Sequence, residues 1–314
     1  MTKRLVSLML FAAIASSLLS MRTEAQQVAD SSFAPAIVRP AYPQGRGPVI
    51  MLDEAHFNFH TAGGRYLPFA ELLRRDGYVV KESASPFSKA YLRSGRILVI
   101  ANALAERNQT DWSLPTPSAF SDEEIAVVCD WVKDGGSLLL IADHMPFAGA
   151  AEKLAAAFGI HFSNGYAVAE NAQGRMMFRR SAESLRDCPI TRGRTGAERV
   201  DSVATFTGSA FEVLKSVQPL LVLGPSVASI MTSVAGQATA DTPRIPVGGW
   251  YQGAVLRFGK GRVAVFGEAA MFSAQLAGPE RIPMGMNAPA AAQNAQFLLN
   301  VMHWLSGKLR GAKS

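Results

Sequence analysis

The chain has 314 residues, a formal net charge of +6 at neutral pH, 48% hydrophobic residues and 18% charged residues. This composition is typical of a globular protein with a full core and excludes extensive disorder. The basic residues are scattered, with short clusters only at Arg179–Arg180 and towards the C-terminus, so the sequence predicts no nucleic-acid partner.

The N-terminus is typical of an export signal. Lys3 and Arg4 precede an almost wholly apolar run from Leu5 to Leu19, and the small residues Thr23 and Ala25 stand where a signal peptidase reads. The alternative is a retained membrane anchor, but a run of about fifteen residues is short for a span, which needs roughly 20. We therefore predict residues 1–25 as a signal peptide cleaved after Ala25, and a periplasmic or secreted protein with no stable membrane span.

Short apolar runs then alternate with amphipathic stretches. Residues 26–46, which contain several prolines, are predicted to be an extended lead-in. The predicted strands that follow it are Gly47–Asp53, Tyr78–Lys81, Arg96–Ala101 and Ser137–Ala142. The predicted helices between them are Tyr66–Arg75, Lys89–Leu92 and a helix that a capping box of Ser121 and Glu124 begins. This alternation indicates an α/β fold, doubly wound and flavodoxin-like, with a mostly parallel sheet covered by helices on both faces.

The second half of the chain is less regular. Residues 164–208 are rich in Arg, Ser, Thr and Gly, which predicts an irregular excursion over the sheet edge. Later strands are predicted at Leu220–Leu223, Ile230–Val234, Ala254–Phe258 and Arg262–Phe266, the last two as a hairpin. A helix over Ala290–Leu305 follows, with His303 expected to be exposed. We predict one domain over residues 47–306 and a basic tail over 307–314.

Polar side chains follow four of the predicted strands. They are Asp53 with Glu54, His56, Asn58 and His60 after the first strand, Asn102 after another, Asp143 with His144 after the central one, and Glu268 after the last. Ligands of open parallel sheets bind outside the carboxyl ends of the strands, so we expect these side chains at one edge of the sheet.

Three interpretations of this cluster stay open. Imidazoles and carboxylates bind zinc and related ions, and His56, His60 and His144 would suffice for a site with three ligands, because a spacing of four places His56 and His60 on one side of a helix or strand. Alternatively, the cluster is a metal-free site for a polar ligand. Its candidate binding residues are then Asp53, Glu54, Asn58 and Asn102. The third interpretation is that these groups bond one another and cap loops.

Other catalytic signatures are weak. The sequence has no Gly-x-Ser-x-Gly elbow, which disfavours a hydrolase of that type. Cys129 and Cys188 are the only cysteines. A disulfide between them is compatible with export, but Cys129 falls on the apolar face of a predicted helix, where free buried thiols are common.

Several motifs together resemble the class I glutamine amidotransferase-like superfamily, in particular its exported branches and the trehalose-utilisation-type proteins. The motifs are Asp53–His56, Gly135–His144, Cys188–Gly193, Gly261–Glu268, Asn294–Asn300 and Trp304–Leu305. The resemblance covers most of residues 47–306 and implies the fold more than an activity.

The chain departs from that family at the nucleophile. Amidotransferases carry a cysteine at the sharp turn after the strand that here ends at Ala142–Asp143, and this chain has His144 there. The resemblance therefore implies no thiol glutaminase, but keeps His144 as a general base or ligand that Asp143 or Glu268 orients. We expect an enzyme of hydrolase or isomerase type, or a binding protein, for a carbohydrate-like small molecule. The alternative is a non-catalytic binding or scaffold module of the cell envelope.

Overall fold

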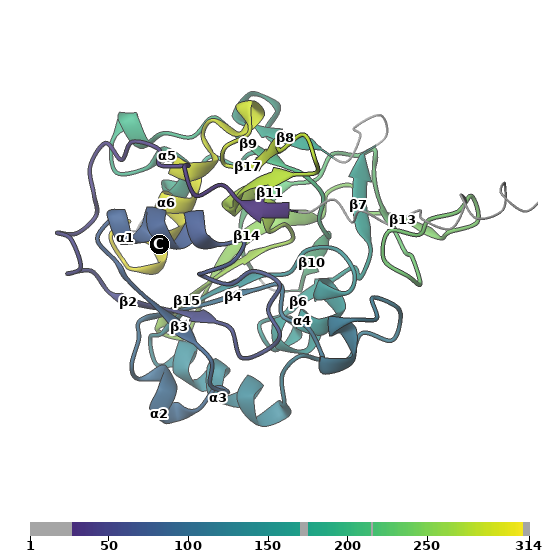
Figure 1. The fold of residues 1–314 in the computed structure, drawn as a ribbon, viewed down its shortest axis with the longest axis horizontal. Coiled ribbons are helices and arrows are strands. Elements are labelled where there is room, and N and C mark those ends of the chain that lie inside the picture. The colour runs from purple at the N-terminus through teal and green to yellow at the C-terminus, as the bar shows by residue number, and fades with distance from the viewer. Residues whose placement is uncertain (1–26, 170–174, 215, 310–314) are drawn as a thin grey trace, which may run out of the picture.

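The computed structural model describes residues 27–169, 175–214 and 216–309 (Figure 1). The predicted signal peptide and residues 310–314 of the predicted basic tail lie outside the described residues. Within the described ranges, no helix is both long enough and apolar enough to cross a membrane.

A nine-stranded sheet forms the centre of the described structure, with the order β3-β2-β4-β5-β15-β14-β10-β6 and with β11 paired to β14. The strands are β2 (Val49–Asp53), β3 (Val79–Ser83), β4 (Ile97–Ala101), β5 (Ser137–Ile141), β6 (Ile160–Phe162), β10 (Phe211–Val213), β11 (Gln218–Val222), β14 (Tyr251–Phe258) and β15 (Gly261–Phe266). Pairing is parallel from β3 through β15 and antiparallel from β15 onwards. The predicted α/β class is confirmed, and so is the hairpin of β14 and β15.

Helices cover both faces of this sheet (Figure 1). One face carries α1 (Leu67–Arg75) and α6 (Asn294–Leu305), and the other carries α2 (Lys89–Leu92), α3 (Asp122–Lys133) and α4 (Phe147–Ala157). Strand β4 shows how burial on both faces determines the amino-acid sequence of a strand. Its five residues are all buried, and alternate side chains enter two separate core clusters, one on each face. A strand buried on both faces must be apolar throughout, which is why β4 and β5 are recognisable in the sequence.

Residues 164–208 are more regular than the sequence predicts. They contain β7 (Tyr166–Ala169), β8 (Met176–Arg179), the short helix α5 (Pro189–Arg192) and β9 (Ser202–Thr205). Strands β8 and β9 pair with each other and bury Phe178 and Val203, but each strand has only four residues, which is too short to show a clear alternation in the sequence.

Besides the pair of β8 and β9, two three-stranded sheets flank the central sheet in the described structure. Strand β7 lies beside β12 (Val227–Ile230), which also pairs with β13 (Arg244–Pro246). The strand predicted over Ile230–Val234 is wrong in its bounds, because the chain leaves this sheet after Ile230 and Val234 bridges to Ser113 instead. The predicted lead-in contributes β1 (Gln27–Ala29), which pairs with β16 (Ala274–Ala277), itself paired to β17 (Ile282–Gly285).

The expected exposure of His303 is also wrong. Helix α6 is buried almost all round, and His303 is fully buried with its Nε2 atom 2.7 Å from Oδ2 of Asp76. Position on the polar side of a helix predicts exposure only where that side faces solvent, and here it faces the loop after α1.

Candidate functional site

The carboxyl ends of β2, β4, β5 and β15 lie side by side, because these strands are consecutive neighbours in the sheet. Their ends carry Asp53, Asn102, Asp143 and Glu268, as the sequence suggests. The side chains nevertheless separate into a closed hydrogen-bonded cluster and an open pocket.

The closed cluster centres on His56. Nδ1 of His56 lies 2.9 Å from Oδ1 of Asp53, and Nε2 lies 3.0 Å from Oε1 of Glu124 at the start of α3. The imidazole packs against the rings of both Phe87 and Phe120, at centroid distances of 4.6 and 4.7 Å. Burial lowers the pKa of His56, but the hydrogen bonds and charges of Asp53 and Glu124 outweigh it and raise the pKa overall. Each ring nitrogen of His56 thus has a carboxylate partner, and the two hydrogen bonds link the end of β2 to the start of α3.

Two further predicted ligand residues serve the same loop. Nδ2 of Asn58 donates to Oδ2 of Asp53 over 3.0 Å, and Oδ1 of Asn58 accepts from the backbone N–H of His56. Oε1 of Glu54 accepts from the backbone N–H of Ala62 over 2.7 Å. Asp53, Glu54 and Asn58 thus hold the backbone after β2, as the third interpretation of the sequence requires.

The pocket lies beside this cluster and has a volume of about 300 Å³. Its walls include four aromatic side chains, and its polar groups come from the segments that follow β2, β4, β5 and β9 and from strands β1 and β16. The lining residues are Gln27, Phe59, His60, Arg65, Asn102, Trp112, Asp143, His144, Phe147, Phe206, Thr207, Ala270, Gln275 and Met284. Apolar walls with a few convergent polar groups are typical of small-molecule sites.

A chain of hydrogen bonds crosses the base of the pocket. The backbone N–H of Asp143 donates to Oδ1 of Asn102 over 2.9 Å, and Nδ2 of Asn102 lies 3.2 Å from Nδ1 of His60. Asn102 has a φ of +52°, a left-handed conformation that asparagine tolerates better than most residues. Burial, together with the charge of Arg65, lowers the pKa of His60 to about 3, so its imidazole is neutral.

His144 stands at the mouth of the same pocket. Its Nδ1 atom lies 2.8 Å from the carbonyl oxygen of Met145 and must donate there, and its ring stacks on Tyr166 at a centroid distance of 4.2 Å. The donated Nδ1 proton leaves Nε2 of a neutral His144 as an acceptor or base. Asp143 accepts from the backbone N–H of His144 over 2.8 Å, so the two predicted catalytic neighbours are held in one turn.

Glu268, the third predicted catalytic residue, lies behind the pocket wall and does not line it. Its carboxylate accepts from the backbone N–H groups of Ala270 and Met271, over 2.8 and 2.7 Å, at the start of the 3-10 helix η4 (Ala270–Phe272). Full burial, with the nearby charge of Asp143, raises the pKa of Glu268 well above its usual range. Its contacts are those of a residue that shapes the turn after β15.

The three histidines proposed as metal ligands do not converge. His56 contacts the core on the α3 face, whereas His60 packs against Tyr66, at 4.6 Å, in the core on the α1 face. Between them Phe57 has a φ of +47°, which interrupts the regular path that would place both rings on one side. Across the described ranges, no group of three or more His, Cys, Asp or Glu side chains is placed to hold a metal ion. Among the described residues, Cys129 and Cys188 are not joined by a disulfide.

Sequence reasoning missed several residues of the pocket. Phe59 and Arg65 lie in the conspicuous stretch after β2, and the cation of Arg65 sits 3.8 Å from the centre of the Phe59 ring. Trp112 carries a weak signal, as a large aromatic residue inside a polar loop. Gln275 has none, because only the pairing of β16 with β1 brings it to this edge.

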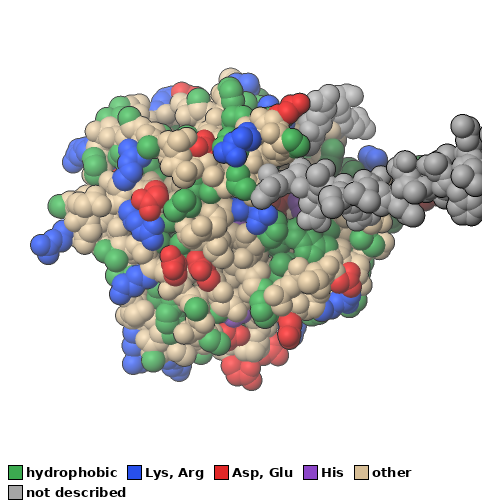
Figure 2. All heavy atoms as spheres, in the orientation of Figure 1, with side chains coloured by type: hydrophobic (Ala, Val, Ile, Leu, Met, Phe, Trp, Pro, Cys, Tyr) green, Lys and Arg blue, Asp and Glu red, His purple; other side chains and the backbone are tan. Residues whose placement is uncertain are grey.

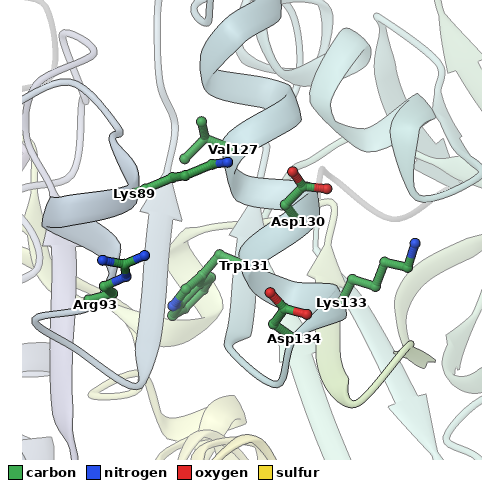
Figure 3. Close-up of a pocket in the computed structure, with 7 residues that line it drawn as sticks. All are labelled: Lys89, Arg93, Val127, Asp130, Trp131, Lys133 and Asp134. Carbon is green, nitrogen blue, oxygen red and sulfur yellow. The ribbon is translucent and has the colours of Figure 1, made fainter.

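A second hollow is a weaker candidate. It measures about 520 Å³ and lies between α2 and α3, where charged side chains of both signs surround Trp131 (Figure 3). Asp134 in its lining lies three residues before β5, so this groove lies towards the amino ends of the strands, away from the crevice of an α/β sheet. Such mixed charges recur over the face in Figure 2, where Lys and Arg are dispersed among acidic and apolar side chains.

No protein-family model matches the chain, and neither does any curated protein sequence. Among solved structures, the mmIFT52 N-terminal domain is similar with a TM-score of 0.55 and 14% identity, over 82% of this chain and 97% of that one. A ThuA-like protein from Bacteroides uniformis has a TM-score of 0.46 and 12% identity, over 87% and 94%. A beta-galactosidase from Bacillus circulans sp. alkalophilus has a TM-score of 0.44 and 10% identity, over 83% of this chain but 31% of its own. At 14% identity, the similarity to the mmIFT52 N-terminal domain shows a shared fold alone.

Proposed function

We propose that this protein binds a polar small molecule of the carbohydrate class in the pocket at the carboxyl ends of β4 and β5. The observation that carries the proposal is the combination of four aromatic walls, Phe59, Trp112, Phe147 and Phe206, with a polar base. A sugar ring has an apolar face that packs on aromatic side chains and hydroxyl groups that need directed hydrogen bonds, so it matches both features.

The size of the pocket also suits such a ligand. Its 300 Å³ stand at the lower end of the range for small-molecule sites. A second depression of about 520 Å³ adjoins it and shares Phe59, Arg65 and Trp112 with it. The shared wall would let a disaccharide or a larger conjugate extend outwards from the pocket.

We propose ligand binding rather than catalysis as the function of the pocket. His144 and Asp143 line the pocket and could exchange protons with a ligand, but Glu268 faces backbone amides and His56 belongs to the closed cluster. The predicted catalytic set of His144, Asp143 and Glu268 is therefore only partly gathered at the pocket. A binding module, exported as its N-terminal sequence indicates, is the function that these positions support best.

The finer classification of the fold belongs to this proposal. Numbered along the chain, the parallel strands β3-β2-β4-β5-β15 have the order 2-1-3-4-5, which is the flavodoxin-like order. The turn after β5 carries His144 at the place where amidotransferase-like domains hold their nucleophile. Both features support membership of an amidotransferase-like branch that lacks the catalytic thiol.

Isothermal titration calorimetry with a panel of sugars tests the proposal. The panel contains glucose, galactose, mannose, trehalose and myo-inositol, and the variant Trp112→Ala removes one aromatic wall. We expect the wild type to bind at least one of them, and Trp112→Ala to weaken that binding at least tenfold. Trp131→Ala is the matched control, because it removes a tryptophan from the groove between α2 and α3. No binding by the wild type, or equal losses in both variants, would refute the proposed function.

A further inference from the structure

We infer that His60 and Gln275 form a fixed donor and a fixed acceptor that recognise uncharged hydroxyl groups of the ligand. The inference rests on the proposed function and specifies which ligand chemistry the pocket selects. Nε2 of His60 and Oε1 of Gln275 are both buried without a hydrogen-bond partner, although both residues line the pocket.

The tautomer of His60 follows from its neighbours. The backbone N–H of Asp143 can only donate, so the atom of Asn102 that it contacts is the amide oxygen, and the Asn102 nitrogen must face His60. That nitrogen is a donor, which makes Nδ1 of His60 an acceptor. A neutral imidazole then carries its proton on Nε2, so His60 presents an N–H donor that has no partner.

The orientation of the Gln275 amide follows in the same way. The hydroxyl of Ser273 donates to the carbonyl oxygen of Ala270 over 2.9 Å, which leaves only lone pairs on its oxygen. The Gln275 atom 2.7 Å from that oxygen must therefore be Nε2, the amide donor. Oε1 of Gln275 remains as an acceptor without a partner, on a side chain that is 1% exposed.

An unpartnered buried donor and an unpartnered buried acceptor are both costly, and native structures contain few of each. Here one of each occurs in the same pocket. The other ring nitrogen of His60 is hydrogen-bonded to Asn102 and the amide nitrogen of Gln275 is hydrogen-bonded to Ser273, which fixes both side chains. A ligand hydroxyl can accept from His60 and can donate to Gln275, whereas a carboxylate or phosphate can satisfy only the first. The pocket should therefore prefer a neutral sugar or polyol to the corresponding sugar acid at this position.

Nitrogen-15 NMR of the histidine side chains tests the inference without a ligand. Resonances are assigned to His60 by their absence in His60→Phe, which keeps an aromatic ring against Tyr66. We expect a neutral imidazole with its proton on Nε2 from pH 8 down to about pH 4. A proton on Nδ1, or a charged imidazole in this range, would overturn the inference whatever the protein binds.

Calorimetry then tests recognition, using the sugar from the panel that the wild type binds best, its monodeoxy analogues and its uronic acid. The wild type should bind one or more deoxy analogues and the uronic acid at least tenfold more weakly than the parent. Gln275→Met should lose that discrimination and keep a melting temperature close to that of the wild type, because removal of an acceptor that is unsatisfied in the free protein offsets the loss of the hydrogen bond to Ser273. Thr205→Val is the control, since its buried hydroxyl is also unpartnered but lies outside the pocket lining.

The outcomes separate the two claims. If the wild type binds no sugar, the proposed function is refuted and the inference falls with it. If the wild type binds a sugar through Trp112 but Gln275→Met and His60→Phe keep the full discrimination among the deoxy analogues, only the inference is refuted. Preference for the uronic acid over the parent sugar would also overturn it.

Discussion

Replacing His56 with phenylalanine should destabilise the protein without touching the pocket. The substitution keeps an aromatic ring against Phe87 and Phe120, so it leaves little cavity, but it removes both N–H donors from Asp53 and Glu124. A hydrogen bond to a charged group contributes roughly 1.5–3 kcal/mol, so two of them contribute about 3–6 kcal/mol. Each carboxylate keeps other donors, and we therefore expect the lower end, a loss of about 3 kcal/mol in the free energy of unfolding near pH 6.

The pH dependence of this loss follows from the raised pKa of His56. A histidine whose folded-state pKa exceeds its unfolded value of about 6.5 stabilises the fold fully below that value. The stabilisation is then lost as the pH rises through the folded-state pKa. The difference between wild type and His56→Phe should therefore be largest at pH 6 and below, and shrink towards pH 9.

Urea denaturation followed by tryptophan fluorescence, repeated between pH 5.5 and pH 9, measures this difference. Sugar affinity of the folded variant at pH 6 serves as the control and should stay within twofold of the wild type. A loss below about 1 kcal/mol, or a loss that grows with pH, would contradict the assignment of His56 as a charged link between two carboxylates.

Three further changes test separate parts of the structure. His144→Ala should abolish sugar binding in calorimetry and leave the melting temperature nearly unchanged, because the side chain is partly exposed at the pocket mouth; a large loss of stability with intact binding would make the residue structural. His303→Leu should cost about 3 kcal/mol in urea denaturation, because it leaves the buried carboxyl group of Asp76 without the imidazole that lies 2.7 Å away; an unchanged free energy of unfolding would mean that this contact does not stabilise the fold. Ser121→Ala should cost about 1 kcal/mol by the same assay, because it removes the N-cap of α3; a change within 0.3 kcal/mol would mean that the cap is replaced by water.

The sequence is sufficient to locate the edge of the sheet where the candidate pocket lies. Strands β4 and β5 are continuous apolar runs that end at a polar residue, and parallel strands bring their carboxyl ends together. The capping box of α3 was equally legible, because both of its members stand within four residues. Signals of this kind depend on local spacing, which the sequence states directly.

The partners of each polar group could not be predicted in the same way. Oε1 of Glu124 bonds His56 from 68 positions away, and the antiparallel half of the sheet brings in β10 and β11 after long intervening segments. The sequence predicts that acids and histidines gather at one edge. It does not predict which of them satisfy one another, because that depends on the left-handed turn at Phe57 and on pairings between distant segments.

The contrast between His56 and His60 shows why that distinction decides function. The two residues stand four positions apart and are almost equally buried, yet both nitrogens of His56 have carboxylate partners and one nitrogen of His60 has none. The hydrogen bonds of His56 to two carboxylates stabilise the fold, and a ligand that bound His56 would have to displace one of them. The unpartnered nitrogen of His60 has lost its hydrogen bond to water and has no replacement in the free protein. A ligand that supplies an oxygen acceptor restores a hydrogen bond there, and the desolvation penalty is recovered as binding free energy. The loop after β2 thus holds the fold with one histidine and offers the other to the pocket.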